Sequence, residues 1–144
     1  MRRRVNILMV LLLAAFVLWG VDIAQVDSLL VRYRDAFNSG DFEEVRPLLS
    51  SGFTYADFDT HLSYSILESF VYLAPYSIED FDNVAISPAG KDTVIVAFDM
   101  MVSYAGVQDT IPQAFVVVYE GDSLKIGALI DPDLVSPEEG KIRR

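Results

Sequence analysis

Three ionisable side chains that alternate along the chain, Asp57, Asp59 and His61, have the residue types of a metal site. In an extended segment all three would point the same way, and carboxylates with an imidazole form a donor set that zinc accepts. The same residues also suit a polar loop that enters a helix, with Thr60 or Ser63 as its cap. His61 is the single histidine of the chain. A set with one nitrogen donor among carboxylates selects weakly for a transition metal, so we predict no metal and no other cofactor.

The remaining polar residues form no recognised catalytic motif. The sequence has no serine–histidine–acid triad, no phosphate-binding loop and no basic patch. Any chemistry must therefore come from residues that the fold brings together, and the strongest candidates lie in an apolar setting.

Alternation in the C-terminal half predicts strands with one apolar face. If Phe98 points inward, Met100 and Val102 share its face, because successive side chains of a strand point to opposite sides.

The elements that must position these residues follow from the apolar periodicity. The predicted helices cover residues 26–38, 42–49 and 63–73, and the predicted strands cover 53–56, 78–86, 93–104, 110–119 and 124–130. Helices that precede a run of antiparallel strands indicate an α+β domain, with the helices packed on one face of the sheet.

The segment Arg32-Tyr33-x-x-Ala36-x-Asn38-x-Gly40-Asp41 resembles the opening of nuclear transport factor 2-like domains, a superfamily that includes ketosteroid isomerases and SnoaL-like polyketide cyclases. The resemblance covers residues 26–131, and the Asn-x-Gly-Asp turn is its specific part. It implies a cone, in which a curved antiparallel or mixed sheet wraps around the long first helix and leaves a pocket inside. Within such a cone Tyr33 and Asp57 would supply polar groups to an apolar pocket, as in the general design of small-ligand sites. The residues predicted to line the pocket with them are Phe37, Tyr55, Phe98, Met100, Val102, Gln113, Phe115, Val117, Tyr119 and Ala128.

The resemblance also implies roles for individual residues. Tyr33 falls where the isomerases keep the tyrosine of the oxyanion hole, and Asp57 falls where they keep the catalytic base. Phe115 stands where they keep a second acid, with Gln113 two residues earlier on the same face. Tyr33 also fits a plain core tyrosine, and Asp57 fits a turn or a helix cap. We predict a non-catalytic ligand-binding or interaction module; an isomerase- or cyclase-type enzyme that uses Asp57 and Tyr33 is the alternative.

The N-terminus has the pattern of a membrane-targeting segment. Three arginines, Arg2 to Arg4, precede an apolar run over residues 5–21, as in a secretory signal or a signal anchor. The candidate cleavage sites are weak, so both a cleaved signal and a retained transmembrane helix stay open. We assign residues 1–24 to the signal peptide or anchor, 25–133 to the domain and 134–144 to a flexible tail. The predicted location is extracytoplasmic, periplasmic or secreted, with residues 5–21 in contact with the membrane.

Charge and composition limit the partners. The formal net charge is −10 and there is no cysteine, which excludes a disulfide framework and a lipoprotein anchor. Such an acidic domain is repelled by nucleic acid, so we predict none as a partner. The strand over 93–104 is apolar on both faces. Ile95, Ala97 and Met101 on its outward face are candidates for a homodimer interface through the sheet.

Overall fold

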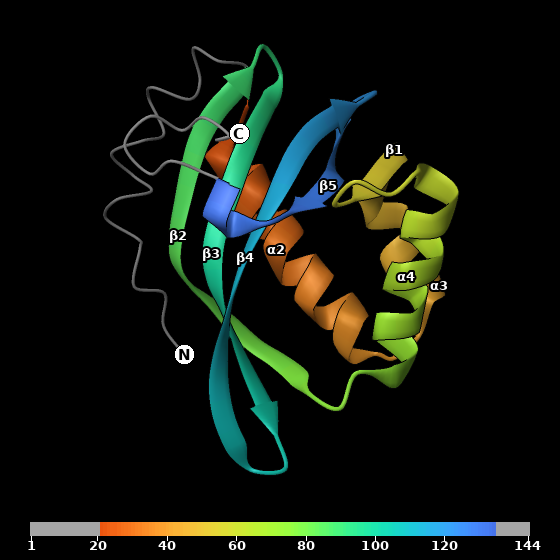
Figure 1. Cartoon of the computed structure of the whole chain (residues 1–144). Coiled ribbons are helices and arrows are strands. Elements are labelled where there is room, and N and C mark those ends of the chain that lie inside the picture. The colour runs from red at the N-terminus through yellow and green to blue at the C-terminus, as the bar shows by residue number, and fades with distance from the viewer. Residues whose placement is uncertain (1–20, 135–144) are drawn as a thin grey trace.

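The long helix α2 lies in the concave face of a curved sheet in the computed structural model, which describes residues 21–134 (Figure 1). In chain order the elements are α2 (Ile23–Asn38), α3 (Phe42–Val45), the 3₁₀ helix η1 (Arg46–Leu48), β1 (Leu49–Tyr55), α4 (Thr60–Leu73), β2 (Ser77–Gly90), β3 (Thr93–Tyr104), β4 (Val107–Glu120), β5 (Ser123–Ile130) and η2 (Pro132–Leu134). The five strands form one sheet in the order β1-β5-β4-β3-β2. β1 pairs with β5 in parallel, and the other pairs are antiparallel, so the predicted α+β class and the mixed sheet are confirmed.

α2 is amphipathic, and its apolar stripe fills the inside of the sheet. Val26, Leu29 and Tyr33 on this stripe are buried, as the helical spacing predicted. The helix begins at Ile23, three residues before the predicted start, because the Asp22 side chain accepts a hydrogen bond from the Ala24 amide and caps it. The signal or anchor helix predicted over residues 5–21 lies almost wholly outside the described residues. Within residues 21–134, no helix is long and apolar enough to cross a membrane.

The Asn-x-Gly-Asp turn joins α2 to the rest of the fold. The Asn38 side-chain amide donates to the Ile78 carbonyl and accepts from the Ile78 amide, both at 2.8 Å, which fastens the end of α2 to the start of β2. Gly40 has a φ of +73°, which glycine adopts without steric cost, and the Asp41 side chain caps α3. Pro47 lies in η1, so the second predicted helix ends early and the chain enters β1 at Leu49.

The inner face of the sheet carries the core. The even-numbered residues of β3 from Val94 to Val102 are buried and face α2, as predicted from the position of Phe98. In β5 the inward position predicted for Ala128 is wrong. Ala128 is paired with Val116 and Ile126 with Val117, so Gly127 is an extra residue in a β-bulge. The bulge shifts the parity of the strand and turns Leu129 to the inside in place of Ala128.

The outer face of the sheet is less open than its sequence indicated. Ile95, a candidate for the dimer interface, is only 2 % exposed within the single chain. Ala97 and Met101 are half-buried, and η2 contacts β4.

Candidate functional site

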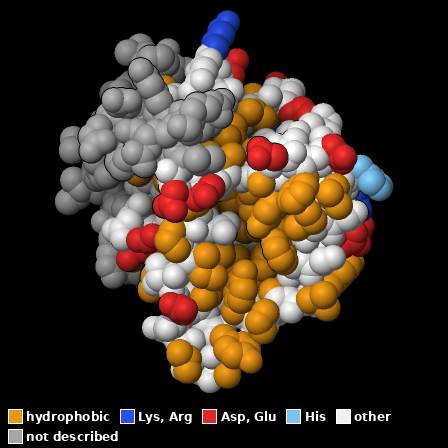
Figure 2. All heavy atoms as spheres, in the orientation of Figure 1, with side chains coloured by type: hydrophobic (Ala, Val, Ile, Leu, Met, Phe, Trp, Pro, Cys, Tyr) orange, Lys and Arg blue, Asp and Glu red, His pale blue; other side chains and the backbone are white. Residues whose placement is uncertain are grey.

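A cavity of about 460 Å³ opens between α2, α4 and the sheet. It is lined by Tyr33, Phe37, Tyr55, Leu67, Ser69, Phe70, Leu73, Ala74, Pro75, Tyr76, Met100, Gln113 and Leu129. Figure 2 shows hydrophobic side chains gathered over this face, with acidic side chains around them. The volume is within the range of small-molecule sites, and the lining is largely apolar with few polar groups, as such sites usually are.

Tyr33 forms the inner wall of the cavity. Its side chain is 3 % exposed and makes an edge-to-face contact with Phe115, with ring centroids 5.1 Å apart. Burial raises the pKa of the Tyr33 hydroxyl well above its ordinary value, and the nearby Tyr76 and Tyr55 raise it further. Among residues 21–134 the Tyr33 hydroxyl has no hydrogen-bond partner, whereas every fully buried polar side-chain atom has one. The Tyr33 oxygen is therefore not fully buried, and the hydroxyl is reachable from the cavity as a neutral donor.

Replacing Tyr33 with Phe should make the free energy of unfolding fall less steeply with pH in the alkaline range. A hydroxyl with a raised pKa keeps its proton in the folded state after the unfolded chain has lost it. Stability is therefore intact below pH 10, the ordinary tyrosine value, and falls as the pH rises above it. One such group contributes about 1.4 kcal/mol per pH unit. Urea unfolding of the wild type between about pH 9 and about pH 11 should show the steeper loss. Tyr72→Phe, at an exposed tyrosine, is the control, and equal slopes for Tyr33→Phe and wild type would contradict the assignment.

Hydrogen bonds of Ser63 and Asn38 position the segments that carry Tyr55 and Tyr76. The buried Ser63 hydroxyl accepts from the Tyr55 amide at 2.8 Å and donates to the Asp59 carbonyl at 2.7 Å. These two hydrogen bonds hold the start of α4 against the end of β1 and place Tyr55 at the cavity. The bonds of Asn38 to Ile78 hold the start of β2, and with it the turn that carries Tyr76.

Aromatic rings make up much of the wall. Phe37 and Tyr76 are stacked with centroids 5.8 Å apart, and Tyr55 and Phe70 form a tilted pair at 5.8 Å. Each pair joins a helix residue to a residue of a strand or a turn, so the rings connect the elements around the cavity. Tyr33 contacts Phe37 at 6.0 Å and links this wall to the core.

The structure brings five of the predicted site residues together at the cavity: Tyr33, Phe37, Tyr55, Met100 and Gln113. Phe98, Val102, Phe115 and Val117 are buried in the core behind it. Tyr119 is half-buried, and its hydroxyl donates to the Gln25 side chain. Ala128 is turned outward by the bulge at Gly127.

Asp57 is not among the residues that line the cavity. It is exposed in the turn that follows β1, and Ala56 before it has a φ of +53°. The described residues thus bring no carboxylate to the cavity wall beside Tyr33.

The alternating trio of Asp57, Asp59 and His61 does not form a chelating group. Asp59 is the N-cap of α4, where its carboxylate accepts from the Leu62 amide at 2.8 Å. Asp57 and His61 are exposed on either side of it. Across residues 21–134 no cluster of His, Cys, Asp and Glu could hold a metal ion.

Helix α4, the turn after it and Leu129 of β5 contribute the part of the site that the sequence did not predict. These residues are Leu67, Ser69, Phe70, Leu73, Ala74 and Pro75, together with Tyr76 and Leu129. One signal was present in the sequence: α4 carries more apolar residues than a single buried face requires. Phe70 and Leu73 are left 45 % and 78 % exposed at the cavity, where they extend the apolar lining to the surface.

No protein-family profile and no curated protein matches the chain, but its structure is similar to several solved structures. An "Ntf2 like protein involved in plasmid conjugation" is 16 % identical with a TM-score of 0.54; the match covers 74 % of this chain and only 37 % of that one. A protein from Catenulispora acidiphila in complex with S-DNPA is 18 % identical with a TM-score of 0.57, over 74 % of this chain and 88 % of that one. A protein of unknown function with a cystatin-like fold, from Nostoc punctiforme, is 13 % identical with a TM-score of 0.57, over 77 % and 92 %.

These likenesses confirm the resemblance at the level of the fold. The chain has the cystatin-like cone of nuclear transport factor 2-like proteins, with α2 inside the curved sheet. At identities this low the likeness carries no activity, because one fold supports many functions. The function must therefore be argued from the cavity.

Proposed function

We propose that this domain binds a small apolar molecule in the cone cavity without transforming it. The observation that carries the proposal is the composition of the wall. The lining is made of aromatic and aliphatic side chains around the hydroxyl of Tyr33 and the amide of Gln113, and it includes no Asp, Glu, His, Lys or Arg. A site of this kind can orient a ligand through one or two hydrogen bonds, but it has no general base to move a proton.

One of the similar folds supports ligand binding as a use of this architecture. The Catenulispora acidiphila protein was solved in complex with S-DNPA, and the match spans most of both chains. For this chain the supporting features are its own: a volume of about 460 Å³, an opening to solvent beside α4, and a buried donor at the inner end. A role in protein interaction, the other non-catalytic use, would draw on the same exposed residues of α4.

Narrowing the opening of the cavity should weaken ligand binding. Ser69 and Ser65 are both exposed on α4, but only Ser69 lines the cavity. We expect Ser69→Trp, which places an indole in the opening, to weaken binding of the neutral fluorescent probe N-phenylnaphthylamine by about tenfold or more, or roughly 1.4 kcal/mol. Ser65→Trp puts the same ring on the same helix away from the cavity and should leave the affinity within about twofold of the wild type.

Fluorescence titration with circular dichroism of each variant measures this difference. If the probe does not bind the wild type, or if both tryptophan variants bind it equally well, the cavity is not the ligand site.

The enzyme alternative requires Asp57 to act on a ligand held by Tyr33. The exposed position of Asp57 and the aromatic Phe115 at the position of the isomerases' second acid do not favour it. We therefore propose the binding function ahead of the isomerase or cyclase function. A location outside the cytoplasm, attachment through residues 5–21 and a homodimer through the sheet stay predictions of the sequence.

A further inference from the structure

The cavity is lined by five aromatic rings and by no basic group. Tyr33 lies at the inner end, and Phe37, Tyr55, Phe70 and Tyr76 come from α2, β1, α4 and the turn before β2. The face of an aromatic ring carries a negative partial charge and attracts cations, most strongly where water is excluded. Besides the tyrosine hydroxyls, the polar groups of the lining are the Ser69 hydroxyl and the Gln113 amide, and each carries an oxygen that can also face a positive charge.

The protein around the cavity is strongly negative. Residues 21–134 hold nineteen Asp and Glu against five Lys and Arg, a formal net charge of −14. Clefts with low-dielectric walls focus the field of such a charge distribution and concentrate ions of the opposite sign. Acidic side chains border the apolar face in Figure 2.

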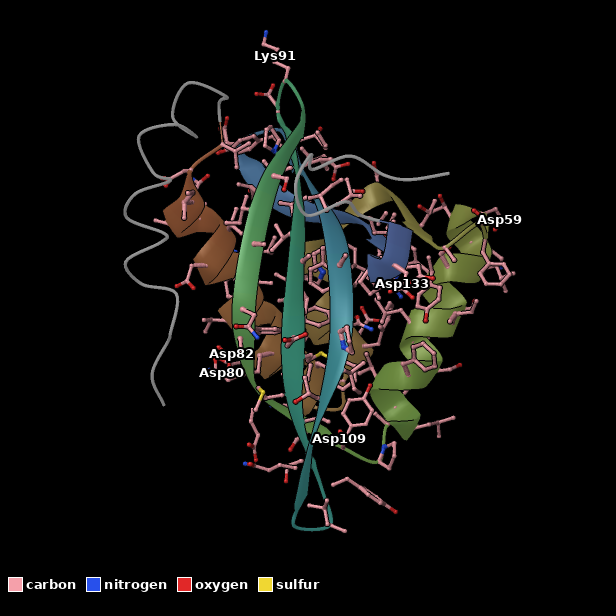
Figure 3. All side chains as sticks on the ribbon, turned by 60° about the vertical axis from the view of Figure 1, so that its left-hand side comes forward. Asp59, Asp80, Asp82, Lys91, Asp109 and Asp133 are labelled. Atoms are coloured by element: carbon pink, nitrogen blue, oxygen red, sulfur yellow. The ribbon has the colours of Figure 1, made fainter. Side chains whose placement is uncertain are left out.

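None of the five basic side chains lines the cavity, and three of them interact with other groups. Arg34 is paired with Asp35, Arg46 with Glu43, and Lys125 donates to the Pro47 carbonyl. Lys91 lies at the end of the sheet opposite Asp109 (Figure 3). In the β3–β4 register, Met100 and Gln113 lie toward the Asp109 end.

We propose that the cavity prefers apolar cations, such as aryl or alkyl quaternary ammonium compounds, over neutral molecules of the same shape, and that it excludes organic anions. The inference rests on the proposed function and adds the charge of the ligand to it. An aromatic wall supplies attraction that needs no carboxylate in contact with the ligand, and the acidic surface supplies a field of the matching sign. An anion meets that field without a basic side chain at the wall to offset it.

Two ligands of matched shape and one anion with the same ring test the preference. The cation (naphthylmethyl)trimethylammonium and the neutral neopentylnaphthalene differ only by nitrogen in place of carbon, and naphthylacetate supplies the anion. In displacement of N-phenylnaphthylamine from the full chain at low salt, we expect the cation to bind about three- to tenfold tighter than the neutral compound. The anion should bind at least about tenfold weaker than the cation. Raising the salt from about 20 mM to about 500 mM should narrow the difference, because the field of exposed charges is screened.

A pair of ring deletions tests the aromatic wall itself. Phe70 and Tyr72 are both exposed on α4, but only Phe70 lines the cavity. Phe70→Leu should weaken cation binding by about two- to fivefold and change the neutral compound by less than about twofold. Tyr72→Leu should change neither affinity.

The outcomes distinguish failure of the charge preference from failure of the proposed binding function. If the neutral compound binds as tightly as the cation, or the anion binds tightest, the charge preference is overturned while the binding function stands. If Tyr72→Leu weakens the cation as much as Phe70→Leu does, the wall is not the source of the preference. If neither the probe nor any of the three compounds binds the wild type, the proposed binding function fails, and the charge preference fails with it.

Discussion

A chain that begins at Gln25 should lose about 4–7 kcal/mol of its free energy of unfolding relative to a chain that begins at Gly20. Val21 and Ile23 are 1 % and 3 % exposed and belong to the core cluster that α2 forms with the sheet. Burying an aliphatic side chain of this size contributes about 1.5–3 kcal/mol. The Asp22 cap on the Ala24 amide adds about 1 kcal/mol. A loss of this size is comparable to the whole stability of a small domain.

Urea unfolding followed by circular dichroism measures the difference between the two chains. A third chain that begins at Gly20 and carries Asp22→Ala isolates the cap and should lose only about 1 kcal/mol. Equal unfolding midpoints for the chains that begin at Gly20 and Gln25 would show that the first turn of α2 is dispensable.

The expected difference in stability bears on the N-terminal domain boundary that the sequence suggested. A division between residues 24 and 25 passes through the first turn of α2 and removes two core residues. If the leader is cleaved, cleavage before Val21 leaves the core whole, whereas cleavage near Gln25 does not. We therefore expect the intact mass of the mature protein to place its N-terminus at or before Val21.

The features that follow from local periodicity were predictable from the sequence. The stripe of α2, the turn at Gly40 and the inward face of β3 each depend on spacing or on one residue type, and the structure confirms them. Together with the alternation of β4, they place Tyr33, Phe37, Met100 and Gln113 at the cavity, because these four residues lie on elements whose direction the spacing determines.

The features that the sequence did not predict depend on tertiary packing. Gly127 inserts an extra residue in β5, and no alternation rule marks where a strand changes parity. The residues of α4 line the cavity because that helix packs across the open end of the cone, a position set by the Ser63 tie to β1. Asp57 lies outside because the chain turns at Ala56, where φ is positive, before α4 begins.

Replacing Phe115 with Ala should cost about 3–5 kcal/mol of the free energy of unfolding. Phe115 is fully buried in β4 and makes edge-to-face contacts with Tyr33 and Phe98, at 5.1 Å and 5.0 Å between centroids. Truncation to Ala removes the buried ring and both aromatic contacts, and leaves a void between α2 and the sheet. Phe115→Leu keeps most of the volume, so it should cost about 1.5 kcal/mol or less beyond the loss of those contacts.

Tyr104→Ala is the matched control, because Tyr104 is 57 % exposed at the end of β3 and should change stability by about 0.5 kcal/mol or less. Thermal and urea unfolding of the three variants and the wild type tests whether Phe115→Ala is the least stable and Phe115→Leu lies between it and the wild type. The Phe115→Leu variant also separates the two functions of this part of the fold. Phe115 supports Tyr33 from behind without lining the cavity, so Phe115→Leu should lower stability while the probe still binds. A Phe115→Leu variant that is as stable as the wild type but does not bind would instead place Phe115 in the ligand site itself.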